Sequence, residues 1–176
     1  MTVTVTSNSG SIATITTNGT VAGGTTLTFS NVTTTAVGTI VVQGRALGST
    51  TITVQAPGYN DGTSTVTVQP SGFYLQTGNI STTTFSANTT VSVAPARLDP
   101  TTLNFAQQQA LRGGLSVSVV VTSSNTTVGT IVCVPASPGC SQVDFTGGDL
   151  SKSVAFDPAT AGTTTISLPA TPPAGF

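Results

Sequence analysis

Strict alternation of polar and apolar residues runs through most of this chain, and it limits the fold more than any other feature. Successive side chains of a β-strand point to opposite faces, so alternation is typical of strands with one buried face. In residues 115–121 the odd-numbered apolar side chains are expected to face a core, whereas Ser116 and Ser118 face water. The pattern predicts strands at residues 2–6, 11–16, 25–29, 39–43, 49–55, 63–69, 73–76, 90–94, 102–105, 115–122, 130–134, 142–145, 151–156 and 163–168.

Turn signals separate these predicted strands. Asn18-Gly19, Pro57-Gly58 and Asp61-Gly62 are pairs that favour tight turns. A convincing helical period is not seen, and residues 106–111 are expected to form one helical turn at most. Many short strands at this spacing predict an all-β, antiparallel β-sandwich. An up-and-down barrel is the alternative, and the internal repeat described below favours separate sandwich modules.

The composition favours a folded β-protein over a disordered stalk. Only 5% of residues are charged, and threonine is the commonest residue. Threonine and valine are β-branched, which favours strands. A disordered threonine-rich chain is the alternative, but such chains lack apolar residues to bury. Here 37% of residues are hydrophobic, and they alternate with polar ones.

An internal repeat is the most informative feature for domain organisation. Residues 3–15 (VTVTSNSGSIATI) match residues 119–131 (VVVTSSNTTVGTI) without a gap, at an offset of 116 (119 − 3). Residues 47–54 (LGSTTITV) match residues 161–168 (AGTTTISL) at an offset of 114 (161 − 47). Between them, the Gly23-Gly24 pair is matched to Gly147-Gly148, each ahead of a predicted strand that ends in phenylalanine, Phe29 or Phe156. The period of roughly 115 residues is the size of one ordinary domain.

The repeat predicts two modules, residues 1–70 and residues 71–176. The first is expected to lack the leading segment that precedes residue 119 in the second. The second is expected to lack a counterpart of the strand at residues 63–69. We therefore expect a window cut from a longer array, or subunits that complete one another.

Several motifs resemble a known class of domain. Residues 47–54, followed by Ala56-Pro57-Gly58-Tyr59, look like the closing strands of bacterial Ig-like repeats. Residues 95–103 (PARLDPTTL) and 111–117 (LRGGLSV) resemble repeats of large, secreted multi-Ig proteins. The resemblance implies tandem Ig-like antiparallel β-sandwich modules, an extracellular or cell-surface location, and a role as stalk, adhesin or filament subunit. It implies no ligand and no cofactor.

Charge and residue types argue against several functions. The chain has four Lys and Arg residues and no patch of them, so nucleic acid is not an expected partner. Its apolar runs, such as residues 119–121, are too short to span a membrane. The segment after Met1 lacks the basic and apolar regions of a signal peptide. With no His, no Glu and a single Lys152, the chain is not expected to be an enzyme.

Two cysteines enclose a short, turn-rich loop. Cys133 and Cys140 flank Val-Pro-Ala-Ser-Pro-Gly, and a disulfide there would join the two sides of a hairpin tip in an oxidising compartment. Two free, buried thiols are the alternative. A metal site is not expected, because two Cys without His offer too few soft ligands.

Three further residues are candidates for special chemistry. Asp144 and Asp149 flank a Thr-Gly-Gly turn that is a weak candidate for calcium, since that ion needs six or more oxygen ligands. A polar hairpin turn is the favoured interpretation. Lys152 is the sole candidate for an intramolecular isopeptide bond, but it alternates with serines and is expected to face solvent.

The sequence has features relevant to carbohydrate both as a covalent modification and as a bound ligand. Three aromatic residues at the predicted module junction, Tyr59, Phe73 and Tyr74, favour packing between modules, with a carbohydrate-stacking platform as the alternative. O-linked sugar on exposed threonines is an equal candidate to N-linked sugar. The N-glycosylation sequons lie at Asn18, Asn31, Asn79, Asn88 and Asn125.

The sequence as a whole predicts a structural protein. We expect a repeat or subunit of an extracellular bacterial surface filament or adhesin stalk. Its expected partners are other copies of itself or adjacent Ig-like repeats, joined end to end by donor-strand-type β-complementation. The alternative is an adhesive or carbohydrate-binding Ig-like module on a surface protein, with glycans as partners. An accessory domain of a large secreted enzyme is a third option.

Overall fold

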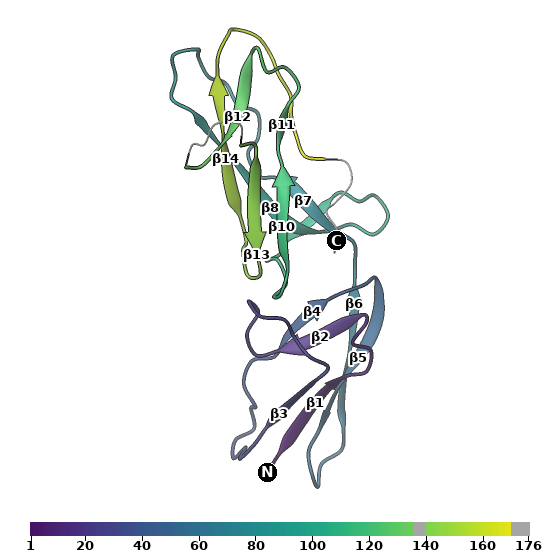
Figure 1. Cartoon of the computed structure of the whole chain (residues 1–176). Helices are drawn as coiled ribbons and strands as arrows, with labels where there is room; N and C mark the ends of the chain where they lie inside the picture. Colours follow the sequence, from purple (N-terminus) through teal and green to yellow (C-terminus); the bar gives the residue numbers. More distant parts are fainter. Residues whose placement is uncertain (136–139, 170–176) are drawn as a thin grey trace. The chain divides into compact units, whose positions relative to one another are not determined.

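The chain folds into β-strands and loops. The structure is a computed structural model that describes residues 1–135 and 140–169, and no helix occurs in these residues (Figure 1). Every strand pair is antiparallel. The predicted all-β class is therefore confirmed, and the sheets are those of β-sandwiches. The chain divides into two compact units, Met1–Pro70 with Arg112–Leu115, and Ser71–Leu111 with Ser116–Phe176.

Unit 1 contains two sheets. A four-stranded sheet has the order β3-β1-β5-β6, and β2 pairs with β4 in a second sheet. The edge strand β6 pairs with β5 over seven positions, from Gly48 opposite Val68 to Val54 opposite Gly62. The strands are β1 (Val3–Ser7), β2 (Ala13–Thr16), β3 (Thr26–Phe29), β4 (Val41–Gly44), β5 (Gly48–Gln55) and β6 (Gly62–Val68).

The core of unit 1 lies between these two sheets. Val5 and Ile52 from the larger sheet pack with Ile15 from the smaller one. Val66 of β6 is partly buried against this cluster, as are Leu27, Phe29, Ile40 and Val54. Alternation along β1 and β5 thus buries one set of side chains and leaves the threonines between them partly exposed, as the sequence predicts.

Unit 2 contains more strands. Its largest sheet has the order β12-β14-β8-β7, with β9 beside β8, and two further pairs are β10 with β13 and β11 with β15. The segment predicted as one strand at residues 115–122 is divided into β10 and β11 at Val121. The strands are β7 (Ser71–Leu75), β8 (Thr89–Leu98), β9 (Phe105–Gln108), β10 (Ser116–Val120), β11 (Thr122–Ser123), β12 (Gly129–Cys133), β13 (Gln142–Thr146), β14 (Lys152–Pro158) and β15 (Ile166–Ser167).

The core of unit 2 contains three of the four predicted inward positions, and the fourth, Leu115, is half-buried and grouped with unit 1. Val117, Val119 and Val121 are buried, whereas Ser116 and Ser118 are exposed. The ring of Phe73 on β7 lies 5.0 Å, centroid to centroid, from the buried ring of Phe145 on β13. This contact joins the large sheet to the β10–β13 pair. The other buried apolar side chains include Val91, Val93, Ile131, Val143, Val154 and Phe156.

The two units share one pairing scheme. Thr6 of β1 faces Thr53 of β5, and the residues 116 and 114 positions later, Thr122 and Ser167, face each other in β11 and β15. The same offsets relate the β2–β4 register to that of β12 and β14, since Ala13 faces Gly44 and Gly129 faces Pro158. They also relate the β1–β3 register to that of β10 and β13. Strand β6 has no counterpart among the described residues of unit 2.

Local hydrogen bonds recur at the same offsets. The Ser9 N–H donates to Thr50 Oγ1 at 2.9 Å, and the Asn125 N–H donates to Thr164 Oγ1 at 2.9 Å. Three more backbone N–H to carbonyl bonds of unit 1 have equivalents in unit 2 at the same offsets. Given as donor to acceptor, first in unit 1 and then in unit 2, they are Asn8 to Thr51 and Ser124 to Thr165, Ile12 to Ser9 and Val128 to Asn125, and Arg45 to Ile12 and Ala159 to Val128. Matching side-chain and backbone bonds require the same local path of the chain in both units.

The structure corrects one part of the predicted repeat. Gly23-Gly24 precede β3, but Gly147-Gly148 follow β13, the strand with the equivalent register. Phe29 corresponds to Val143 and not to Phe156, because Val3 faces Phe29 and Val119 faces Val143. Gly147-Gly148 form a turn after β13, whereas Gly24 makes an isolated antiparallel β-bridge with Ile15 ahead of β3. The offset changes from 116 to 114 between β12 and β13, so two residues are lost in that loop.

A second correction concerns residues 99–108. The strand predicted at 102–105 is wrong except at Phe105, which begins β9, and β9 includes residues 106–108 of the segment where one helical turn at most was expected. The Asp99 carboxylate accepts hydrogen bonds from the backbone N–H groups of Thr101 and Thr102 at 2.9 and 2.8 Å. Leu103 adopts a left-handed φ of 57°. An aspartate-capped turn therefore occupies the place of the predicted strand.

Hydroxyl groups pair across neighbouring strands on the exposed faces. Ser49 and Thr67 lie 2.9 Å apart between β5 and β6. Ser92 and Ser153 are paired at 3.2 Å between β8 and β14, and Thr122 and Ser167 at 3.0 Å between β11 and β15. Threonine and serine thus provide contacts between strands that ion pairs supply in more highly charged proteins.

Candidate functional site

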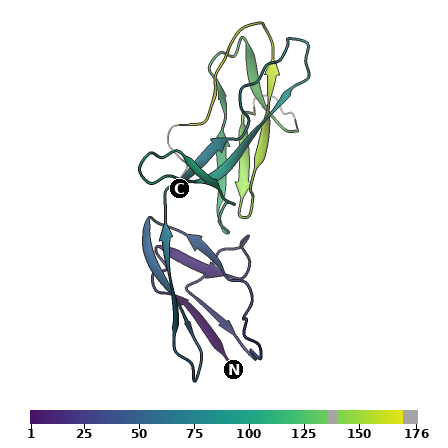
Figure 2. The ribbon, with the colours of Figure 1, turned by 180° about the vertical axis from the view of Figure 1, so that it is seen from behind.

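A groove of about 1040 Å³ opens in unit 2. Two segments line it, residues 77–84 from the β7–β8 connection and residues 160–166, which lead into β15. Figure 2 shows both segments from behind, at the same end of unit 2. Leu75, Val91, Val128, Phe156 and Pro158 complete the lining.

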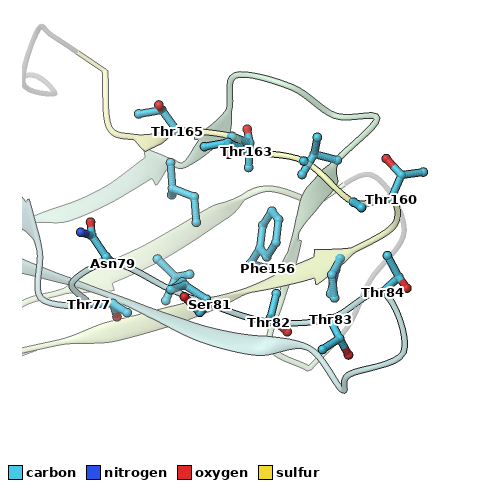
Figure 3. A pocket seen from close by; sticks show the side chains of 18 of the residues that line it. Thr77, Asn79, Ser81, Thr82, Thr83, Thr84, Phe156, Thr160, Thr163 and Thr165 are labelled. Carbon is cyan, nitrogen blue, oxygen red and sulfur yellow. The ribbon is translucent and has the colours of Figure 1, made fainter.

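The groove has an apolar floor and hydroxyl-bearing walls. The side chain of Phe156 lies between the two wall segments (Figure 3). Val91, which also lines the groove, is buried. Ile166 adds a half-buried apolar side chain at one wall. Residues labelled along the two walls are Thr77, Asn79, Ser81, Thr82, Thr83 and Thr84 on one side and Thr160, Thr163 and Thr165 on the other. No Asp, Lys or Arg is among the lining residues. The described lining of the groove therefore suits a neutral, partly apolar ligand.

The aspartates considered for calcium are engaged in hydrogen bonds. Asp144 accepts from the Ser118 hydroxyl at 2.6 Å and from Gln142 Nε2 at 3.0 Å. Asp149 accepts from the backbone N–H of Thr146 at 2.7 Å, which lowers the pKa of Asp149 below its ordinary value. The favoured hairpin-turn interpretation fits this geometry. Among residues 1–135 and 140–169, no cluster of three or more His, Cys, Asp or Glu is positioned to hold a metal ion.

Lys152 is held by an ion pair. Its Nζ lies 3.2 Å from Asp149 Oδ2, and its side chain is 41% exposed. This pair contributes to the lowered pKa of Asp149 after the Thr146 hydrogen bond. A half-exposed amine lacks the buried setting that an intramolecular isopeptide bond requires.

Asp99 is the second carboxylate with a perturbed acidity. The backbone N–H groups of Thr102 and Thr101, and then the Thr102 hydroxyl, lower the pKa of Asp99. All three donors belong to the same turn. Asp99 therefore stabilises this loop.

The predicted disulfide is confirmed. Cys133 at the end of β12 bonds to Cys140, with the two Cα atoms 5.4 Å apart. The bond closes the loop between β12 and β13, where the offset between the units changes. In unit 1 the equivalent connection runs from β2 to β3 and contains no cysteine.

The five candidate N-glycosylation residues are all exposed. Asn18 and Asn125 lie in turns where their side chains accept hydrogen bonds from nearby backbone N–H groups. Asn79 lines the groove of unit 2. The exposed set is Asn18, Asn31, Asn79, Asn88 and Asn125.

The three aromatic residues singled out from the sequence have different surroundings. Tyr59 belongs to unit 1 and is 68% exposed. Phe73 points into the core of unit 2 against Phe145. The ring of Tyr74 points the other way and lies 4.2 Å from that of Phe105 on β9. The structure thus does not gather these three residues into one platform within a unit.

Sequence reasoning missed a polar and aromatic cluster around Tyr74. Gln76 Nε2 donates to the Tyr74 hydroxyl at 3.1 Å and to Gln108 Oε1 at 3.2 Å, and Ser151 donates to Gln76 at 2.7 Å. Phe105 is half exposed beside them. The repeated glutamines at 107–109 were the available signal, but their partners come from strands distant in the sequence.

Comparison with known proteins gives no relative for this chain: no family model, curated protein or solved structure matches it. Among residues 1–135 and 140–169, no helix is long and apolar enough to cross a membrane.

Proposed function

We propose that this chain is a structural part of an extracellular bacterial surface filament or adhesin stalk, built from tandem Ig-like β-sandwich modules that assemble end to end. The observation that carries the proposal is the shared pairing scheme of the two units. Equivalent strands pair in the same register at constant offsets, as Thr6 with Thr53 and Thr122 with Ser167. A module used repeatedly extends a rod and does not build a central active site.

Two further observations support an extracellular role. The Cys133–Cys140 disulfide is compatible with an oxidising environment. The low content of charged residues, 5%, means little electrostatic repulsion between adjacent copies. The exposed threonines of the strands also offer many sites for sugar.

The proposal is tested by the assembly behaviour of the full chain. Electron microscopy and light scattering across a concentration series should show particles that lengthen while their width stays constant. A chain that remains monomeric at its highest soluble concentration, with the disulfide intact, would contradict the filament role.

A carbohydrate-binding module is the second candidate, and the Tyr74–Phe105 pair favours it. Two rings 4.2 Å apart, with the amides of Gln76 and Gln108 nearby, provide stacking surfaces and hydrogen-bonding groups of the kind that bind sugars. A glycan array separates the candidates. Binding that is lost in Tyr74→Ala and kept in the matched control Tyr59→Ala supports the carbohydrate role.

A further inference from the structure

The groove of unit 2 lies where unit 1 has a strand. In unit 1, β6 pairs with Gly48–Val54 of β5. At the offset of 114, the equivalent residues of unit 2 are residues 162–168, and Gly162, Thr163, Thr164, Thr165 and Ile166 all line the groove. Among the described residues up to 169, β15 pairs with β11 and has no strand on its other side. Unit 1 therefore shows what kind of segment this edge accepts.

Backbone direction at this edge supports the same conclusion. Thr165 directs its carbonyl to the Ser124 N–H at 3.0 Å and its own N–H to Ser124 Oγ at 2.9 Å. Successive residues of an extended segment turn these groups to opposite sides. The backbone groups of Thr164 and Ile166 are thus directed toward the groove, where a further strand would pair with them.

Side chains of β6 show which residues the groove would bury. Val66 packs against the core of unit 1, and a Cβ added to Gly44 would meet Val68 at 2.8 Å, so Val68 covers Gly44. Gly44 corresponds to Pro158, which lines the groove. Two valines spaced as in β6 would therefore lie over the apolar floor near Pro158 and Phe156.

We propose that this groove binds one extended polypeptide strand with the alternating threonine and valine pattern of β6, which pairs with the outer edge of residues 162–168. The register is set by unit 1, where Thr50 faces Val66 and Gly48 faces Val68. The first valine of the incoming strand faces Thr164, and the second faces Gly162. This inference rests on the proposed function and adds to it the site and the partner strand.

The direct test uses a fluorescent peptide with the sequence of residues 60–70 and the full chain. Anisotropy should report saturable binding, and a control peptide with asparagine in place of both valines should bind at least about tenfold more weakly, because it cannot fill the apolar floor. Equal binding of the two peptides, or none of either, overturns the proposal.

Crosslinking then tests the register. In unit 1, Thr51 faces Thr65 and Ser49 faces Thr67. A chain with Thr165→Cys should therefore form a disulfide with a peptide carrying cysteine at the position of Thr65, and Thr163→Cys with one carrying cysteine at the position of Thr67, since facing residues bring Cα atoms within disulfide range. The exchanged combinations are the matched controls. Equal yields in all four combinations would refute this register.

A chain with residues 60–70 appended after Phe176 separates this inference from the proposed function. The appended strand should occupy the groove, abolish peptide binding, and slow amide hydrogen exchange at Thr164 and Ile166 by at least about tenfold. The same appendage with both valines replaced by asparagine should do neither. Unchanged peptide binding in the appended chain overturns the inference even if filaments form. Peptide binding without any filament formation would contradict the proposed function and leave the inference about the groove intact.

Discussion

The recurrent threonine side-chain bond offers a sharp test of the equivalence between the two units. Thr50 is 6% exposed, and its Oγ1 accepts the Ser9 N–H at 2.9 Å. Thr50→Val keeps the shape of the side chain but leaves that N–H without its acceptor. An unsatisfied buried donor costs about 1–3 kcal/mol, and because this N–H is only partly buried we expect about 1 kcal/mol in unit 1.

The equivalent change in unit 2 removes two contacts. Thr164 Oγ1 accepts the Asn125 N–H at 2.9 Å in an exposed bond and contacts the Ser123 hydroxyl at 2.8 Å in a partly buried one. Thr164→Val should therefore lower the free energy of unfolding of unit 2 by about 1 kcal/mol, because greater exposure offsets the second contact. Exposed Thr65 on β6 is the matched control, and Thr65→Val should change stability by less than about 0.5 kcal/mol.

Urea titration followed by two-dimensional NMR measures each unit separately, because the resonances of the two units are read independently. The free energy of unfolding is then obtained for each unit from its own midpoint and slope. Thr50→Val should affect unit 1, and Thr164→Val should affect unit 2. If Thr164→Val is as harmless as Thr65→Val, the two hydrogen bonds are not equivalent and the reasoning from shared local structure fails.

Three further predictions concern unit 2. A Cβ at Gly129 would meet the ring of Phe156, so Gly129→Ala should destabilise the unit by about 1–3 kcal/mol, and adding Phe156→Val should recover part of the loss in calorimetry. Replacing Cys133 and Cys140 by serine should lower the free energy of unfolding by up to about 2.5 kcal/mol, because the disulfide closes only a short loop. A urea unfolding midpoint that does not change when the disulfide is reduced would contradict this prediction. The pKa of Asp149 is lowered in the folded state, so the ionised carboxylate stabilises unit 2 above its ordinary pKa, and this stabilisation is lost as pH falls through the lowered value. The free energy of unfolding of unit 2 should therefore decrease below pH about 4. The decrease should be less steep in Asp149→Asn.

Alternation predicted strands well wherever a buried side chain decided the local structure. Val117 and Val119 are buried and Ser118 is exposed, as the pattern requires. It failed where a side chain bonded to its own backbone, because the Asp99 carboxylate fixes a turn that hydrophobic periodicity does not reveal. The repeat was found at its ungapped ends, but the loss of two residues between β12 and β13 led to the wrong match of Phe29 with Phe156.

The groove had no signal in the pattern of hydrophobicity. Residues 77–84 are threonine-rich and do not alternate with apolar residues, and residues 160–164 precede the short strand β15. Their closeness depends on the paths of two connections that lie about 80 positions apart in the sequence. The one clue was that residues 71–169 contain no counterpart of β6, and it required the internal repeat to be recognised first.

Because the hydroxyl pairs between strands are uncharged, they should make the stability of the sheets nearly independent of salt concentration. Dissolved salt weakens attraction between charges, and here the contacts between Ser49 and Thr67 or between Ser92 and Ser153 carry no charge to be weakened. We therefore expect the cohesion of each sheet to be nearly the same in dilute fresh water and in brine. A surface polymer made from such sheets would keep its mechanical strength through changes in salinity.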